Sequence, residues 1–145
     1  MPVAPVFAPG EKMTAPIRIL VVDDSLTIRA MLETVFAREP GVKVVGIAAS
    51  AEEAERMIDQ FRPSVVTVDI AMPGMDGLAL LDRLVAEGQT HVVMLSSHTE
   101  SAIESLGRGA VGFFDKRRIL SDAKGLVQLI RRAAGGRIAR SPMLS

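Results

Sequence analysis

The stretch that decides the fold is residues 65–77, which read VVTVDIAMPGMDG. Its first part is a short run rich in valine, as expected of a β-strand that is buried on both faces of a sheet. The run ends near Asp69, and the Pro73-Gly74 pair that follows is a turn signal. The strand therefore delivers an acidic side chain at its carboxyl end, which is the edge where open parallel sheets bind their ligands.

A second apolar run ends in the same way. Residues 17–22 read IRILVV and are followed directly by Asp23 and Asp24. Two strands with acids at their carboxyl ends can place three carboxylates in one pocket, where the negative charges repel one another. Such a pocket favours a hard divalent cation, so the sequence predicts a metal site made of Asp23, Asp24 and Asp69.

Apolar runs alternate with helical patterns along the rest of the chain. The strands expected are residues 17–22, 42–47, 65–70, 92–95 and 111–114. Each run is followed by residues with the three-four apolar spacing of an amphipathic helix, and Ser50 with Glu53 forms a capping box before the second helix. Five strands alternating with five helices predict an α/β fold, namely a doubly wound, five-stranded parallel sheet with helices on both faces.

Composition limits the classes of function. The chain has 145 residues, with 17 basic and 17 acidic side chains and therefore a formal net charge of zero. Its overall charge gives no attraction to nucleic acid or to a membrane surface, and we expect neither direct DNA binding nor membrane insertion. Cysteine is absent, which excludes disulfides and thiolate metal sites. The N-terminus shows no signal-peptide pattern, so we expect a cytoplasmic protein.

Four dispersed elements carry a family resemblance. They are VDDS at 22–25, Asp69 with MPGMDG at 72–77, Ser96-Ser97 and Lys116. In this order they resemble the receiver domain of two-component response regulators. The strings TVD at 67–69 and VMLSS at 93–97 are most similar to the receiver of chemotaxis methylesterases, although we expect no methylesterase domain in this chain. The resemblance implies the flavodoxin-like strand order 2-1-3-4-5.

The resemblance also implies a role for each site residue. Asp69 would be the phosphoacceptor, and Lys116 would pair with a phosphoryl oxygen. Mg²⁺ would be held by Asp23, Asp24, Asp69 and the backbone carbonyl of Ala71. Ser96 and Phe113 would form the switch that responds to phosphorylation. The domain boundaries that we expect are a flexible extension at 1–16, the receiver at 17–134 and a basic tail at 135–145.

The implied phosphoryl donor is a histidine kinase or a phosphotransfer protein. The implied output is a downstream protein partner, bound by the face of the fourth helix, fifth strand and fifth helix. Because we recognise no effector domain, we expect a stand-alone phospho-receiver with at most self-phosphorylation and self-dephosphorylation activity. Chemotaxis is one setting, and stress or cell-cycle relays are others.

Three positions depart from the family pattern. Arg117 follows Lys116 where the family usually has proline, which leaves the position of the lysine loop open. Phe113 stands where tyrosine is common, and phenylalanine cannot donate a hydrogen bond. Ala71 replaces a frequent polar side chain near the metal.

Two other functions remain open from the sequence. An aspartate-based phosphatase or hydrolase would need a second acid two residues after Asp69, where Ala71 stands. The other is a receiver-like effector that binds an anionic nucleotide, because arginine suits phosphate groups. The basic residues that would serve it are Lys116, Arg117, Arg118, Lys124, Arg131, Arg132, Arg137 and Arg140. We expect Arg131 and Arg132 to point away from the buried face of the last helix, where they could also recognise an acidic protein.

Overall fold

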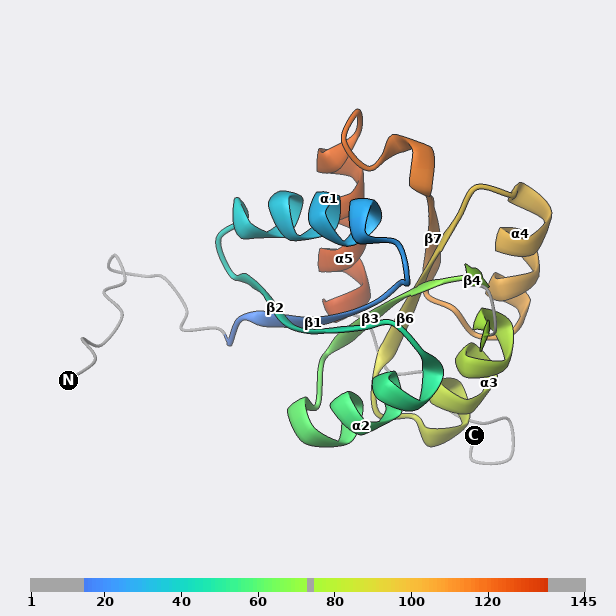
Figure 1. Cartoon of the computed structure of the whole chain (residues 1–145). Helices are drawn as coiled ribbons and strands as arrows, with labels where there is room; N and C mark the ends of the chain where they lie inside the picture. The colour runs from blue at the N-terminus through green and yellow to red at the C-terminus, as the bar shows by residue number, and fades with distance from the viewer. Residues whose placement is uncertain (1–14, 73–74, 136–145) are drawn as a thin grey trace.

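Five parallel strands form the central sheet of the computed structural model, which describes residues 15–72 and 75–135. The strands are β1 (Ile17–Val22), β2 (Val42–Ala48), β3 (Val65–Asp69), β6 (His91–Ser96) and β7 (Gly112–Asp115). Their order is β2-β1-β3-β6-β7, and every neighbouring pair is parallel (Figure 1). The predicted strand order 2-1-3-4-5 is therefore confirmed.

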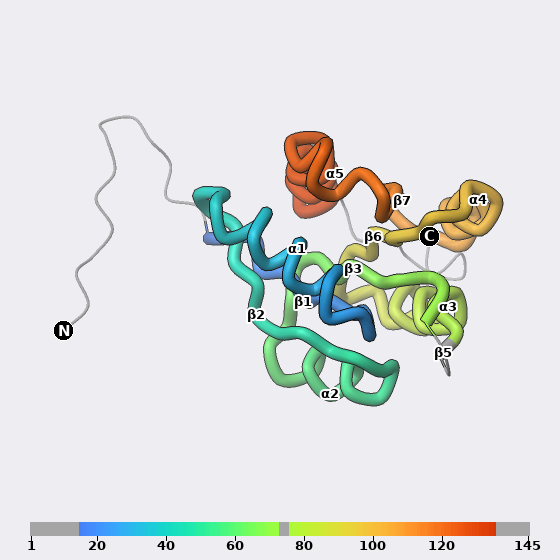
Figure 2. The backbone as a smooth tube through the Cα atoms, turned by 45° about the horizontal axis from the view of Figure 1, so that its top comes forward, coloured from blue at the N-terminus to red at the C-terminus, as the bar shows by residue number. Residues whose placement is uncertain are grey.

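Helices cover both faces of this sheet. They are α1 (Leu26–Ala37), α2 (Ala51–Phe61), α3 (Gly77–Glu87), α4 (Thr99–Gly107) and α5 (Ala123–Gly135). One apolar core lies between the sheet and the α1–α5 layer, and a second lies between the sheet and the α2–α3 layer (Figure 2). The fourth helix packs beside β6 and β7. This is the doubly wound arrangement that the sequence predicts.

Side-chain caps start the helices directly after the strands. The hydroxyl oxygens of Ser25 and Ser50 accept hydrogen bonds from amides in the first turns of α1 and α2. Asp76 caps α3 in the same way, with its carboxylate accepting from the amides of Leu78 and Ala79. The Glu53 carboxylate accepts from the amide of Ala49, so the reciprocal half of the expected capping box lies one residue earlier than Ser50. These short connections fix where each strand ends.

Two small elements were not expected from the sequence. A two-stranded antiparallel ribbon joins β4 (Ala71–Met72) to β5 (Met75–Asp76), and the predicted Pro73-Gly74 turn lies outside the described residues. A single 3₁₀ turn, η1 (Lys116–Arg118), follows β7. Elements of two or three residues are too short to produce a recognisable period in the sequence.

The expected domain boundaries are only partly covered by the structure. The last helix continues through Gly135, one residue beyond the predicted end of the domain. Nearly all of the extension at 1–16 and of the tail at 135–145 lies outside the described residues, so these two segments stay predictions. No helix within the described ranges is long and apolar enough to span a membrane.

One buried hydroxyl group lies in the middle of the sheet. Thr67 is in β3, in register with Val21 of β1 and Val93 of β6, and it is fully buried. Its hydroxyl oxygen has no hydrogen-bond partner among the described residues. Burying a hydroxyl group without a partner costs free energy, since the group loses its hydrogen bonds to water.

We expect Thr67→Val to raise the free energy of unfolding by about 1 kcal/mol, because valine fills the same space without an unpaired hydroxyl group. Urea denaturation at pH 7 would measure the change. The control is Val65→Thr, which adds a hydroxyl group at a buried position of the same strand and should destabilise the protein. A Thr67→Val protein that is less stable than the parent would show that this hydroxyl group is satisfied.

Candidate functional site

The carboxyl ends of β1, β3 and β7 bring a lysine and two buried acids together. The ammonium group of Lys116 donates a hydrogen bond of 2.9 Å to Oδ2 of Asp69. It also lies 3.5 Å from Oδ2 of Asp23, which is an ion-pair distance but too long for a good hydrogen bond. Asp69 and Asp23 have exposed fractions of only 2% and 0%. A cation is needed here because buried carboxylates without a partner are strongly disfavoured.

Backbone amides hold the other oxygen of each buried acid. Oδ1 of Asp69 accepts from the amide of Ala71 at 3.1 Å, and Oδ1 of Asp23 accepts from the amide of Ser25 at 2.8 Å. Both contacts are local, two residues along the chain, and they orient each carboxylate as the strand ends. The second oxygen of each acid is left directed at Lys116.

Charge and burial shift the pKa values of this group. Burial raises the pKa of Asp23 above its ordinary value, and repulsion from Asp69 adds to the rise, while the Ser25 amide and Lys116 only partly offset it. For Lys116, burial alone would lower the pKa. The hydrogen bond to Asp69 and the charges of Asp23 and Asp69 outweigh burial, so the pKa of Lys116 is raised. The ammonium form is thus the stable state beside the acids.

The acidic cluster fits a hard divalent cation. One oxygen from each of Asp23, Asp24 and Asp69 lies within 4.8 Å of the others, with Asp24 exposed to solvent and the other two buried. Oδ2 of Asp23 is buried and has no hydrogen-bond partner among the described residues. Carboxylate oxygens with unused lone pairs are the ligands that Mg²⁺ prefers. The predicted grouping of the three acids is found in the structure, and the carbonyl of Ala71 as a further ligand stays a prediction.

Gly77 is packed directly against the backbone that carries Asp69. A side chain at this position would place its first carbon 2.5 Å from the carbonyl oxygen of Asp69 and 2.8 Å from the Cα atom of Ile70. Real side chains do not approach backbone so closely, so only glycine allows α3 to begin this near the end of β3. In the sequence Gly77 is only the last residue of the motif at 72–77, and its role in placing Asp69 appears only in three dimensions.

The two predicted switch residues border a cavity between the start of α4 and the turn after β7. Ser96 ends β6, and its hydroxyl group donates to the carbonyl of His98 and accepts from the amide of the same residue, both at 2.9 Å. Phe113 is half-buried and lines a cavity of about 220 Å³ together with Ser96, Thr99 and Ala102. In this structure the Ser96 hydroxyl group is therefore engaged with the loop before α4 and not with Asp69.

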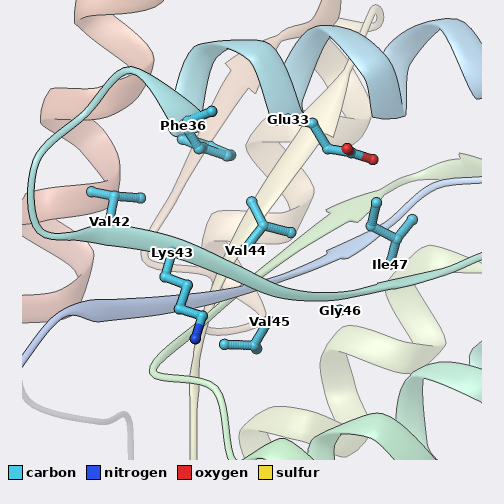
Figure 3. Close-up of a pocket in the computed structure, with 9 residues that line it drawn as sticks. Glu33, Phe36, Val42, Lys43, Val44, Val45, Gly46 and Ile47 are labelled. Carbon is cyan, nitrogen blue, oxygen red and sulfur yellow. The ribbon is translucent and has the colours of Figure 1, made fainter. Parts of the chain in front are cut away.

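A larger cavity than the one beside Ser96 and Phe113 lies elsewhere. It is an open groove of about 530 Å³ between α1 and the edge strand β2. Figure 3 shows Val42 and Val44 directed toward α1, whereas Lys43 points away from it. The groove is lined mainly by aliphatic side chains and does not gather the acids described above, so its size does not make it the functional site.

Comparison with known proteins identifies the class to which this fold and site belong. The family model described as the response regulator receiver domain matches residues 19–131. The chain therefore belongs to the response regulator receiver domain family, as the sequence motifs indicate. Members of this family receive phosphoryl groups in two-component signalling.

Several protein-glutamate methylesterases are similar to this chain. It is 42% identical over 111 residues to the protein-glutamate methylesterase/protein-glutamine glutaminase 1 of Xanthomonas campestris, covering 74% of this chain and 31% of that protein. It is 45% identical over 107 residues to the corresponding enzyme 2 of Shewanella oneidensis, covering 71% and 30%. The chain thus spans about a third of the length of these relatives.

Solved structures give the same result. The response regulator domain of Thermotoga maritima CheB has a TM-score of 0.75 and 35% identity, covering 83% of this chain and 98% of that chain. The receiver domain of NtrX from Brucella abortus has a TM-score of 0.70 and 32% identity, covering 81% and 98%. The resemblance to the methylesterase receiver that the sequence indicates is therefore confirmed.

The raised pKa of Asp23 predicts how stability depends on pH. An acid whose pKa is higher in the folded state destabilises the fold once it ionises, so its cost is present at neutral pH and disappears in acid. Without divalent cations, Asp23→Asn should be more stable than the parent at pH 7. The difference should close as pH falls toward the ordinary aspartate pKa of 3.8.

Chemical denaturation across this pH range, in the presence of a chelator, would test the prediction. Asp24→Asn is the matched control, because Asp24 is exposed and should show a smaller change. If Asp23→Asn is less stable than the parent at pH 7, attraction to Lys116 outweighs the cost of burial, and the pKa of Asp23 is lowered and not raised.

Proposed function

We propose that Asp69 accepts a phosphoryl group from a histidine kinase or a phosphotransfer protein, and that the modified receiver changes a surface that binds a protein partner. The observation that carries the proposal is the Lys116–Asp69 contact of 2.9 Å inside an acidic cluster that fits Mg²⁺. Family membership supports the reaction type, and the geometry supports the assignment of each residue.

In the proposed transfer, one Asp69 oxygen attacks phosphorus while the bond from phosphorus to the donor histidine nitrogen breaks. The products are an aspartyl phosphate and the free histidine of the donor. Lys116 already contacts Oδ2 of Asp69, so its ammonium group is close to the position that the phosphoryl oxygens would occupy. The amide of Ala71 keeps the carboxylate oriented through the other oxygen.

The residues that would hold Mg²⁺ are Asp23, Asp24, Asp69 and the carbonyl of Ala71. When bound, the ion supplies positive charge that offsets the charge of the transferring phosphoryl group. Three carboxylates against one ammonium group leave an excess of negative charge in this cluster. That excess both attracts the ion and would repel a phosphoryl group in its absence.

The proposed switch couples the aspartyl phosphate to α4 and β7. The Ser96 hydroxyl group would leave the backbone of His98 and donate to a phosphoryl oxygen. Phe113 would then move into the neighbouring cavity of about 220 Å³, which it already lines. Phenylalanine can make this movement on packing grounds alone, without the hydrogen bond that a tyrosine would offer. The two arrangements form the bistable element that the phosphoryl charge biases.

Exposed apolar side chains support a protein partner on this side of the molecule. Ile103 and Leu106 on α4 and Val111 before β7 are 59%, 43% and 40% exposed. Neighbouring exposed apolar residues are typical of an interaction surface. Arg131 of α5 is exposed, as the sequence predicts, and in the structure it donates to the Pro40 carbonyl and pairs with Glu39.

The nucleotide-binding alternative loses support because most of the basic side chains that it needs and that the structure describes are already paired with acids. Of the basic residues that it would use, Arg117 is paired with Asp115, Arg118 with Asp122, and Lys116 with Asp69. Arg137 and Arg140 lie outside the described residues. Most of the positive charge that the structure describes in this segment is therefore already compensated within the chain.

We expect acetyl phosphate and Mg²⁺ to add one phosphoryl group to the parent protein and none to Asp69→Asn. Intact-mass spectrometry would measure the label, and a chelator should prevent it. Asp76→Asn is the matched control, because asparagine can also cap α3 and the residue lies outside the acidic cluster. Equal labelling of Asp69→Asn and the parent would refute the assignment.

A second prediction tests the switch. Ser96→Ala should be labelled at Asp69 like the parent. Phosphorylation should no longer move Phe113 in this variant, because alanine cannot donate a hydrogen bond to the phosphoryl group. NMR shifts of the Phe113 ring, recorded with and without phosphorylation, should move in the parent and stay nearly unchanged in the variant. Ser97→Ala provides the control for altering a hydroxyl group in the same loop. Equal ring shifts in Ser96→Ala and the parent would contradict this coupling.

A further inference from the structure

The turn that carries Lys116 is closed by two charged neighbours, one on each side. Asp115 is the last residue of β7 and lies opposite Ser96 in the register of the sheet. Its Oδ1 accepts from the backbone amide of Arg117 at 2.9 Å and from Nε of the Arg117 side chain at 3.0 Å. Its Oδ2 accepts from Nη2 of the same guanidinium group at 2.8 Å. One carboxylate thus binds both the backbone and the side chain of Arg117.

The first effect of this contact is on backbone geometry. Asp115 is the N-cap of the 3₁₀ turn that begins with Lys116. The ladder between β6 and β7 fixes the chain before Lys116, and the cap fixes it directly afterwards. The Lys116 ammonium group contacts Asp69, which is on another strand and 47 positions away in the sequence. A small change in the backbone of this turn would therefore move the ammonium group away from Asp69.

The second effect is electrostatic. The guanidinium group of Arg117 lowers the pKa of the Asp115 carboxyl group, so Asp115 is ionised at neutral pH. Without Arg117, the ionised Asp115 carboxylate would lose its ion-pair partner and leave an uncompensated negative charge next to Lys116 in the chain. Asp115 is next to Lys116 in sequence and opposite Ser96 in the sheet, so an uncompensated charge there would compete with Asp69 for the ammonium group.

We propose that Asp115 and Arg117 are positioning residues for phosphoryl transfer. Asp115 holds the turn of Lys116 by capping it, and Arg117 compensates the charge of Asp115 so that Lys116 stays directed at Asp69. The inference rests on the proposed function of Asp69. It also accounts for the departure from the family pattern at Arg117, since an ion pair here fixes the lysine turn.

Three variants separate the two effects. Asp115→Ala removes the capping oxygen together with the charge, so it should slow labelling by acetyl phosphate at every salt concentration. Arg117→Ala leaves the charge of Asp115 uncompensated and should slow labelling roughly threefold at low salt. The modest size reflects the 69% exposure of the Arg117 side chain, and the effect should shrink as salt screens the charges.

The decisive variant removes both charges but keeps a capping oxygen at position 115. Asp115→Asn in the Arg117→Ala background should restore the labelling rate to within about twofold of the parent, because no uncompensated charge remains. A purely structural role of Arg117 would not allow this rescue. In a Lys116→Ala background, Arg117→Ala should have no further effect, since the residue acts through Lys116. Undiminished labelling of Arg117→Ala at low salt, or failure of the rescue, would overturn the proposal.

A second measurement needs no phosphoryl donor. Hydrogen exchange of the Lys116 ammonium group, followed by NMR, should be slow in the parent, faster in Arg117→Ala and slow again in the double variant. If the parent is not labelled at Asp69 but the exchange rates follow this order, the proposed function fails and the positioning role stands. If the parent is labelled while exchange in Arg117→Ala equals that in the parent, the positioning role fails alone.

Discussion

The contact on which the site depends is the one between a single ammonium group and two buried carboxylates. Asp23 follows β1, Asp69 ends β3, and Lys116 follows β7, so the contact joins three strands at one edge of the sheet. Without the lysine, two buried negative charges would face each other at this edge of the sheet. With it, the acids are held in place but not neutralised. The lysine thus reduces the free-energy cost of burying the acids, and the remaining negative charge can still attract a cation.

Much of this site could be predicted from the sequence because it depends on where strands end. Asp23, Asp24 and Asp69 follow apolar runs, and parallel strands bring their carboxyl ends to one edge. Family motifs added Lys116 and the strand order. The Asp115–Arg117 contact could not be predicted, because it depends on side-chain conformations in a three-residue turn. The contact of Arg131 with Glu39 and Pro40 joins residues about 90 positions apart, which no local period reveals.

The structure also changes the view of the basic C-terminal segment. In the sequence, these residues suggested a surface that captures an anionic partner. In the fold, several of them stabilise local turns or tie helices to loops, and their positive charge is largely compensated. The exposed apolar residues of α4 now carry more of the argument for partner binding. Composition alone could not distinguish these two uses of arginine.

The hydrogen bond from Arg131 to Pro40 has a consequence for modular architecture. It ties the last turns of α5 to the segment just before β2, and the amide of Ile17 binds the neighbouring carbonyl of Gly41. The described chain therefore enters and leaves near the amino ends of the strands, whereas the acidic cluster lies at their carboxyl ends. A unit with this geometry can be joined to other sequences at either end, because both attachment points lie at the opposite edge of the sheet from the acidic cluster.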